Sequence, residues 1–316
     1  MSAAGTATAA YRALTEGCGL VDRSESGKLA LTGGGAKAFL QGQVTNDTEA
    51  LTPGTGLYAA FLTHKAKMLG DLRVLDTGDE LLLLTERVAL AELFNLIRRF
   101  KIGYDVELHK RTIERTLLSL EGPRARAVAG ADALPEAEHA NVADELDGVP
   151  VLLVATQAGV DVIADSAETD RLVAALTERG AEPVSEADAE VTRIERGRPR
   201  YGVELDDTVI PQEAELNDRA VSFTKGCYVG QETVARLFYR GKPNRHLRGL
   251  RLAAPAQRGD ELRLGERVLG HVGSVAESPR FGAIALAIVR REAQPGTTVT
   301  VGDDGATADV VELPFA

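Results

Sequence analysis

Residues 222–232, SFTKGCYVGQE, place a cysteine beside a cation and between two glycines. The thiolate form of cysteine is the nucleophile, and nearby cations and helix N-termini favour it. Lys225 lies two residues before Cys227, and the run QETVARLF predicts a helix that begins near Gly230. Glu232 in the first turn would complement the helix dipole. The segment therefore offers a candidate reactive or ligand-facing thiol.

The same cysteine also has a simpler interpretation. Free cysteine is most often a small buried hydrophobic residue. A catalytic thiol normally needs an oriented base, and the nearest histidine in the sequence is His246. Gly226 and Gly230 bracket Cys227 and would allow a positive φ or the close approach of a ligand. Both interpretations stay open, and the burial of the thiol separates them.

Composition narrows the class of protein. The chain has 316 residues, a formal net charge of −11 and two cysteines, Cys18 and Cys227, with no paired spacing for a disulfide framework or a metal site. The absence of an apolar run of about 18 residues and of a basic, apolar leader predicts no membrane span and no secretory signal. We expect a reducing, cytoplasmic setting. The histidines also lack paired ligand spacing, so no metal is expected: His64, His109, His139, His246 and His271.

Charge is distributed unevenly along the chain. Residues 121–190 hold 16 acidic and 4 basic side chains, whereas residues 233–259 hold no acidic ones. The negative total argues against non-specific nucleic-acid binding, so no DNA partner is expected. An anionic partner would meet residues 233–259 first. The basic residues there are Arg236, Arg240, Lys242, Arg245, Arg248, Arg251 and Arg258.

The hydrophobic pattern predicts an α+β chain. After Pro243, short alternating runs separated by Gly and Pro predict a small all-β module, barrel or sandwich, over 244–316. Before it, strand-like runs alternate with amphipathic helices, and Ser185 is a candidate N-cap. Strands are expected at 27–34, 56–64, 68–76, 80–85 and 149–165, and helices at 35–43, 87–100, 123–130 and 166–179.

The octapeptide KGCYVGQE resembles the signature of the YgfZ family, folate-binding proteins of iron–sulfur cluster maintenance. That family is related to the glycine-cleavage T-protein, an aminomethyltransferase. The similarity runs in order from about residue 18 to the C-terminus. It includes AFLQGQVTND at 38–47, RIERGRPRYGVEL at 193–205, IPQEAEL at 210–216 and RHLRGL at 245–250.

The resemblance implies a three-lobed, T-protein-like cloverleaf around a central opening that holds tetrahydrofolate. Two α+β lobes and a C-terminal small β-barrel are expected. The implied division is 11–112 with 185–243 for the first, folate-binding lobe, 113–184 for the second and 244–316 for the barrel.

Site residues follow from the same resemblance. Glu195 in RIERG matches the carboxylate that the T-protein directs at the pterin ring, whose edge offers an amine beside a ring N–H. Asp71 in KMLGDLRV is what remains of the T-protein's paired acids, and Thr85 stands where that protein has an asparagine. Cys227 belongs to the YgfZ pattern. The further cofactor-binding candidates are Lys225, Gly226, Tyr228, Gln231 and Arg236.

Three functions are compatible with these residues. The first is a tetrahydrofolate-binding accessory factor for iron–sulfur client or assembly proteins, with Cys227 as its functional thiol. The second is a one-carbon transferase with Asp71 as acid/base group, acting on a lipoyl-type or RNA substrate. The third is a non-catalytic module whose basic segment docks RNA or an acidic protein. Polyglutamylated folates are expected to gain affinity from Arg236, Arg240, Lys242 and Arg245.

Overall fold

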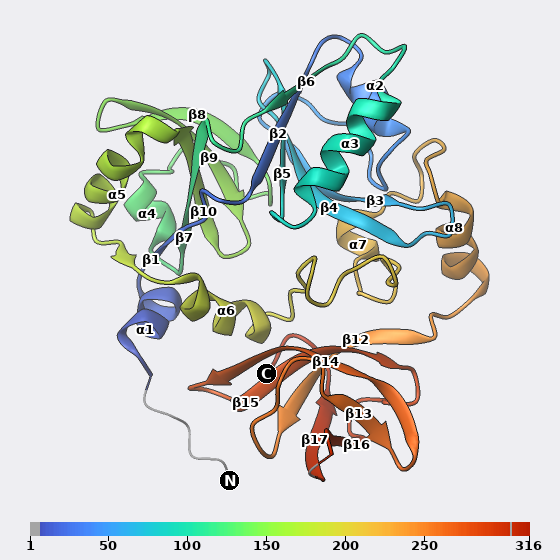
Figure 1. The fold of residues 1–316 in the computed structure, drawn as a ribbon. Coiled ribbons are helices and arrows are strands. Elements are labelled where there is room, and N and C mark those ends of the chain that lie inside the picture. The colour runs from blue at the N-terminus through green and yellow to red at the C-terminus, as the bar shows by residue number, and fades with distance from the viewer. Residues whose placement is uncertain (1–6, 304) are drawn as a thin grey trace.

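The computed structural model describes residues 7–303 and 305–316, which form three lobes (Figure 1). Two lobes are built on open β-sheets, and the third is a closed six-stranded barrel. The α+β fold class, with three lobes and a C-terminal β-barrel, is confirmed. Within the described part of the chain, no helix is long and apolar enough to cross a membrane.

The first lobe is a five-stranded antiparallel sheet. Alternation of side chains gives it two buried faces, one covered by Phe39, Leu93 and Ile97 of its helices. The helices are α2 (Ala36–Gln41) and α3 (Leu90–Phe100). The strand order is β3 (Gly56–Leu62), β4 (Met68–Asp76), β5 (Leu81–Thr85), β2 (Gly27–Thr32) and β6 (Glu107–Lys110).

The second lobe is a six-stranded sheet backed by α4 (Ala125–Ala129) and by α5 (Thr169–Glu178), which follows the 3-10 turn η1 (Ser166–Glu168). The order is β11 (Glu182–Pro183), β1 (Gly19–Asp22), β7 (Arg115–Glu121), β10 (Gly159–Asp165), β9 (Val149–Thr156) and β8 (Asn141–Leu146). The expected lobe boundaries remain a prediction. They assign residues 19–22 to the first lobe, whereas β1 pairs with β7 in the second sheet.

The two sheets pack against each other. Leu82 and Leu84 of β5 meet Leu117 of β7 and Ile163 of β10 in a small apolar cluster. Asn141 extends the contact, since its amide donates to the Thr55 carbonyl at 3.0 Å. Gly56 permits the close approach, because a Cβ there would lie 2.7 Å from the His139 carbonyl oxygen. These contacts fix the position of the two sheets relative to each other beside this cluster.

The barrel closes in the order β12 (Arg245–Leu252), β15 (Gly282–Arg290), β14 (Arg267–Ser278), β13 (Glu261–Leu264), β16 (Thr298–Val301) and β17 (Ala306–Val311). Alternate residues along the strands face inward and fill its interior, among them Leu250, Leu262, Val272 and Val310. The expected small all-β module is thus a barrel and not a sandwich.

The segment between the second lobe and the barrel carries α6 (Glu186–Glu195), α7 (Asn217–Ala220) and α8 (Gln231–Arg240). The predicted N-cap is confirmed: Ser185 and Asp188 form a reciprocal capping box. Helix α6 packs on α1 (Ala9–Glu16) and on β14 and β15 of the barrel. In Figure 1 it lies between the sheet lobes and the barrel, so all three lobes converge on it.

Candidate functional site

A cavity of about 290 Å³ lies where β4, β5, β7 and β10 meet the segment that follows α6. Its lining is rich in charged residues, with seven arginines and five carboxylic acids. Six of the seven arginines form ion pairs with carboxylates. The expected central cavity between the first two lobes is therefore present, and its chemistry is that of a charged, partly desolvated pocket.

Asp71 lines this cavity from β4 and is 8% exposed. The Tyr58 hydroxyl donates to its Oδ2 at 2.5 Å. Thr85 holds the same stretch of β4, because its hydroxyl donates to the Asp71 carbonyl at 2.6 Å. Burial raises the pKa of Asp71 to about 6, since the charged form loses its hydration. The carboxyl can therefore exchange a proton close to neutral pH.

Strand register explains why tyrosine and aspartate meet. In the β3–β4 pair, Tyr58 is opposite Arg73 and Ala60 is opposite Asp71. Tyr58 and Asp71 are consequently diagonal neighbours on one face of the sheet, a separation that a long aromatic side chain spans. Sequence reasoning missed Tyr58, although the alternation of GLYAAFL against MLGDLRV carried this signal.

Arg219 of α7 joins Tyr58 to the second lobe. Its guanidinium lies 5.0 Å from the centre of the Tyr58 ring and pairs with Glu138 at 2.9 Å. His139 follows, 6% exposed and in a left-handed backbone conformation, with φ of 71°. Burial lowers the pKa of His139 to about 4, and the charge of Arg73 adds to the effect. The imidazole is neutral at physiological pH.

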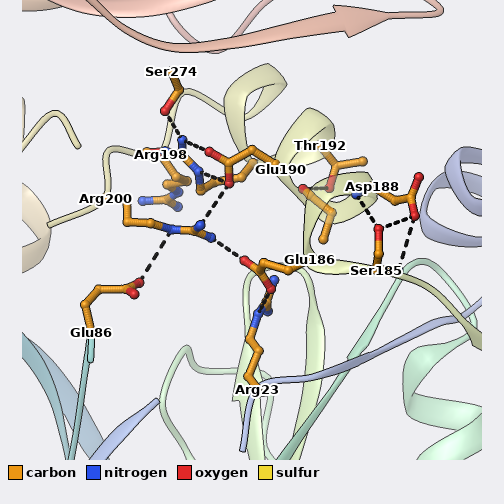
Figure 2. A network of polar contacts seen from close by, with 12 residues as sticks. Arg23, Glu86, Ser185, Glu186, Asp188, Glu190, Thr192, Arg198, Arg200 and Ser274 are labelled. Atoms are coloured by element: carbon orange, nitrogen blue, oxygen red, sulfur yellow. Dashed lines mark hydrogen bonds and ion pairs between the residues drawn. The ribbon is translucent and has the colours of Figure 1, made fainter. Parts of the chain in front are cut away.

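An ion-pair network fixes the floor of the cavity (Figure 2). Arg200 pairs with Glu186 at 2.5 Å and with Glu190 at 3.1 Å, both on α6. It also reaches Glu86, next to β5, at 3.6 Å. Arg193 pairs with Glu190 and donates to Ser274 of the barrel. This network ties the first lobe and the barrel to one helix, so it positions the cavity walls.

The signature lysine has a structural role in the fold. The Lys225 ammonium donates to the carbonyls of Gln41, Val44 and Asn46 at 2.7, 2.7 and 2.8 Å. It also lies 5.0 Å from the centre of the Tyr228 ring. Burial lowers the pKa of Lys225 to about 8, yet three acceptors require the three donors of an ammonium. Lys225 thus anchors the signature to the loop after α2.

The rest of the signature lies away from the cavity lining. Tyr228 belongs to the apolar cluster beneath β3 and β4. Gly230 has a φ of 86°, and a Cβ there would lie 2.7 Å from the Thr63 carbonyl oxygen, which explains the glycine. Cys227 and Gly226 are exposed. Gln231 and Arg236 belong to α8. The candidates of this segment are close to one another but do not line the cavity that contains Asp71.

Glu195 lies at the junction of α1, α6 and the barrel. It is 7% exposed, and its Oε1 accepts hydrogen bonds from Tyr11 at 2.9 Å and from Ser278 at 2.5 Å. The expected position in the cavity wall is not observed for this side chain. Its neighbours in the sequence, Arg193 and Arg196, do line the cavity.

The basic segment does not form one continuous free surface. Arg245 pairs with Glu213 at 2.8 Å and Arg248 with Glu215 at 3.3 Å. Arg251 and Arg258 donate to main-chain carbonyls. Exposed cations remain on and just after α8, namely Arg236, Arg240 and Lys242.

These observations define a three-lobed protein with a polar central cavity bounded by two sheets and a connecting helix. The family models agree: the GCVT N-terminal domain matches residues 2–225, and the glycine cleavage T-protein C-terminal barrel domain matches residues 245–316. The chain belongs to this family.

Individual relatives extend the match over nearly the whole chain. It is 30% identical to an aminomethyltransferase of Rubrobacter xylanophilus, over 97% of this chain and 85% of the relative. It is 27% identical to a putative chloroplastic transferase of Arabidopsis thaliana, over 97% and 73%. The glycine cleavage system aminomethyltransferase T of Bartonella henselae superposes with a TM-score of 0.86, at 23% identity, covering 97% of this chain and 88% of that one.

Proposed function

We propose that this protein binds a reduced folate in the central cavity and that Asp71 is the acid/base group of a one-carbon transfer. The observation that supports this most directly is the buried Asp71 carboxyl, hydrogen-bonded to Tyr58 and lining the cavity. The relatives named as aminomethyltransferase and putative transferase support the same reaction class.

The residues present fit a reduced folate. A pterin edge offers an amine and a ring N–H, and four acids besides Asp71 line the cavity and can accept such donors. Its carbonyl and ring nitrogens need donors, and the cavity holds arginines in excess over acids. Small-molecule pockets measure about 300–1,000 Å³. At about 290 Å³ this cavity suits the ring system alone.

Bound tetrahydrofolate supplies the nitrogen that accepts the one-carbon unit. Asp71 is the group of this chain that moves the proton. Tyr58 donates to its Oδ2, and no other described side chain donates to this carboxyl. With a pKa of about 6, Asp71 is partly protonated at neutral pH and can give or take a proton. The hydrogen bonds of Tyr58 and Thr85 keep Asp71 in place, and the ion-pair network holds the walls of the cavity.

The test is a calorimetric titration with tetrahydrofolate, followed by single-turnover transfer from an aminomethylated lipoyl-type carrier. Asp71→Asn preserves shape and the acceptor for Tyr58, so binding should stay within about threefold while transfer falls about 10²–10⁴-fold. A wild-type protein that binds no tetrahydrofolate would refute the proposal. Transfer at the wild-type rate by Asp71→Asn would remove Asp71 from the reaction.

A second candidate is the finer YgfZ-type assignment, a cytoplasmic folate-binding accessory protein for iron–sulfur proteins with Cys227 as functional thiol. It is supported by the KGCYVGQE segment and by the exposure of Cys227. An exposed thiol outside the cavity suits contact with another protein better than contact with a bound folate. If Cys227→Ser fails to restore iron–sulfur enzyme activities in a strain lacking this protein, while Asp71→Asn restores them, the accessory function is favoured over transfer.

A further inference from the structure

Helix α8 packs on the rest of the protein through only a small part of its surface. Val234 is its one buried residue, and Leu237 is partly buried against the same apolar cluster. In Figure 1, α8 lies at the edge of the molecule, beside the turn between β3 and β4. That turn touches the start of the helix, because a Cβ on Gly230 would lie 2.7 Å from the Thr63 carbonyl oxygen. Most of the surface of α8 is therefore free of contact with the described part of the chain.

An exposed aromatic cluster forms between α8 and the segment before it. Phe223 and Phe238 stack with their ring centres 3.8 Å apart and their planes 18° apart. Tyr239 meets the Phe238 ring at 5.0 Å in an edge-to-face arrangement. Phe238 is 47% exposed and Tyr239 66%. The whole chain has eight phenylalanines and six tyrosines, so this is an unusual concentration of aromatic rings at its surface. Exposed apolar patches of this kind are typical of interaction sites.

Positive charge accompanies the aromatic cluster. Arg236 and Arg240 belong to α8, Lys242 follows the helix, and Lys65 lies in the adjoining β3–β4 turn. All four side chains are exposed, and none forms an ion pair with a described residue. Glu232 is the only acid of α8. Unlike the arginines of the central cavity, which are mostly paired with carboxylates, these cations keep an unbalanced charge.

The combination of rings and cations fits a protein better than a nucleic acid. Aromatic side chains and arginine are enriched at the centres of protein interfaces. The rings here stack on one another and form one compact apolar group, whereas single strands of nucleic acid need separate rings for successive bases. A nucleic acid would also extend past the cluster over a chain of net charge −11, which repels a polyanion.

We propose that Phe223, Phe238 and Tyr239, together with the adjoining cations, form a docking surface for an acidic segment of another protein. An apolar side chain of that segment packs on the aromatic rings, and its carboxylates pair with the cations around them. None of the residues of this surface lines the central cavity, so the inference does not depend on folate binding there.

The experiment measures the fluorescence anisotropy of three labelled probes of equal chain length with the wild-type protein, at low and high salt. The probes are a peptide of glutamate and leucine, a peptide in which serine replaces every leucine, and an oligouridylate. The glutamate–leucine peptide should bind at least about tenfold more tightly than the glutamate–serine peptide, because only the former supplies an apolar anchor. Salt should weaken the binding of both peptides.

Variants at matched positions locate the binding. Phe238→Ser should weaken binding of the glutamate–leucine peptide about tenfold, whereas Phe100→Ser, at a 45% exposed ring that ends α3, should leave it within about twofold. Tyr239→Ser changes the more exposed ring and should act like Phe238→Ser, which guards against a loss of fold in either variant. Arg240→Gln should reduce the salt dependence. Arg99→Gln, whose arginine is exposed and lies 5.4 Å from the centre of the Phe100 ring, should leave it unchanged.

A glutamate–leucine peptide that does not bind the wild type, or that binds no better than the glutamate–serine peptide, would overturn the proposal. Equal losses in Phe238→Ser and Phe100→Ser would also overturn it, because the binding would then have no preference for α8. If the oligouridylate binds more tightly than the glutamate–leucine peptide and Phe238→Ser abolishes this binding, the surface belongs to a single-stranded nucleic acid and the proposal fails.

Discussion

Tyr58 and Asp71 form a 2.5 Å hydrogen bond across one step of the β3–β4 pair, inside the wall of the central cavity. The Tyr58 hydroxyl and the Asp71 carboxyl are both weak acids that are buried away from water. Burial and then the Asp71 charge raise the pKa of Tyr58 well above its usual value. Tyr58 therefore stays protonated throughout the accessible pH range, and the titrating group of the pair is Asp71.

Asp71→Asn is expected to stabilise the fold at neutral pH. The folded pKa of about 6 lies above the ordinary value of about 3.9, so the native state binds the proton more tightly than the unfolded state. The stability contributed by Asp71 is complete below pH 4 and is lost as the pH rises through 6, about 2–3 kcal/mol in all. Urea unfolding from pH 4 to 8 should show wild type and variant converging at low pH. A variant less stable than wild type at pH 7 would contradict the buried carboxyl.

His139 should act in the opposite direction over nearly the same range. Its folded pKa of about 4 lies below the ordinary value of about 6.5, so the unfolded state binds the proton more tightly. The stability it contributes is present above pH 6.5 and is lost as the pH falls through 4, about 3 kcal/mol in all. His139→Asn tolerates the positive φ and cannot titrate. Its stability relative to wild type should rise steadily between pH 6.5 and 4. A constant difference over that range would mean that His139 is solvated.

Lys225→Met should destabilise the protein without touching the cavity. The variant leaves the carbonyls of Gln41, Val44 and Asn46 without their shared donor. The expected cost is about 2–4 kcal/mol in the free energy of unfolding. Lys242→Met removes the same charge from an exposed position and should change stability by less than about 0.5 kcal/mol. Equal effects of the two changes would show that the hydrogen bonds from Lys225 to the three carbonyls contribute nothing to stability.

Glu195→Ala tests whether Glu195 binds the folate or serves as a structural hydrogen-bond acceptor. The change strands the buried hydroxyls of Tyr11 and Ser278, so a loss of about 1–3 kcal/mol of stability is expected. Tetrahydrofolate affinity should stay unchanged in the folded variant, measured by calorimetry well below its melting temperature. Weakened binding with undiminished stability would instead return Glu195 to the pterin, as the resemblance to the T-protein implies.

Local elements could be predicted from the sequence, because short-range patterns determine them. The alternating runs after Pro243 form the barrel strands, and Ser185 caps α6 through Asp188. These features depend on side-chain alternation and on contacts a few residues apart. Asp71, which lies within strand β4, is expected only from the resemblance of KMLGDLRV to the T-protein.

The cavity could not be predicted in this way. It joins Tyr58 and Asp71 to His139 of the second lobe and to Arg198 and Arg219 of the connecting segment. No spacing rule links them, because packing between the two sheets brings them together. Lys225 illustrates the same limit of local patterns. A lysine beside a cysteine indicated chemistry, but its acceptors lie about 180 residues earlier in the chain, as at Gln41 and Asn46.

The two cysteines should differ sharply in reactivity. Cys227 is exposed, whereas Cys18 is 3% exposed and burial raises its pKa to about 11. The prediction that Cys18 is packed is confirmed. Iodoacetamide should therefore add one group to the native protein at pH 8, on Cys227, and two after unfolding, as peptide mass spectrometry can show. At that pH only about one Cys18 thiol in a thousand would be thiolate, so its native alkylation should be at least 100-fold slower.

Cys227→Ser then decides what the exposed thiol is for. Because the side chain is exposed, stability should change by less than about 0.5 kcal/mol, and tetrahydrofolate affinity should be unaffected. Under the accessory function, the variant loses its ability to restore iron–sulfur enzymes although it folds and binds folate. Cys18→Ser is the control that perturbs a buried site and should lower stability instead. If Cys227→Ser restores those enzymes fully, the thiol has no part in that function and the transferase assignment centred on Asp71 gains.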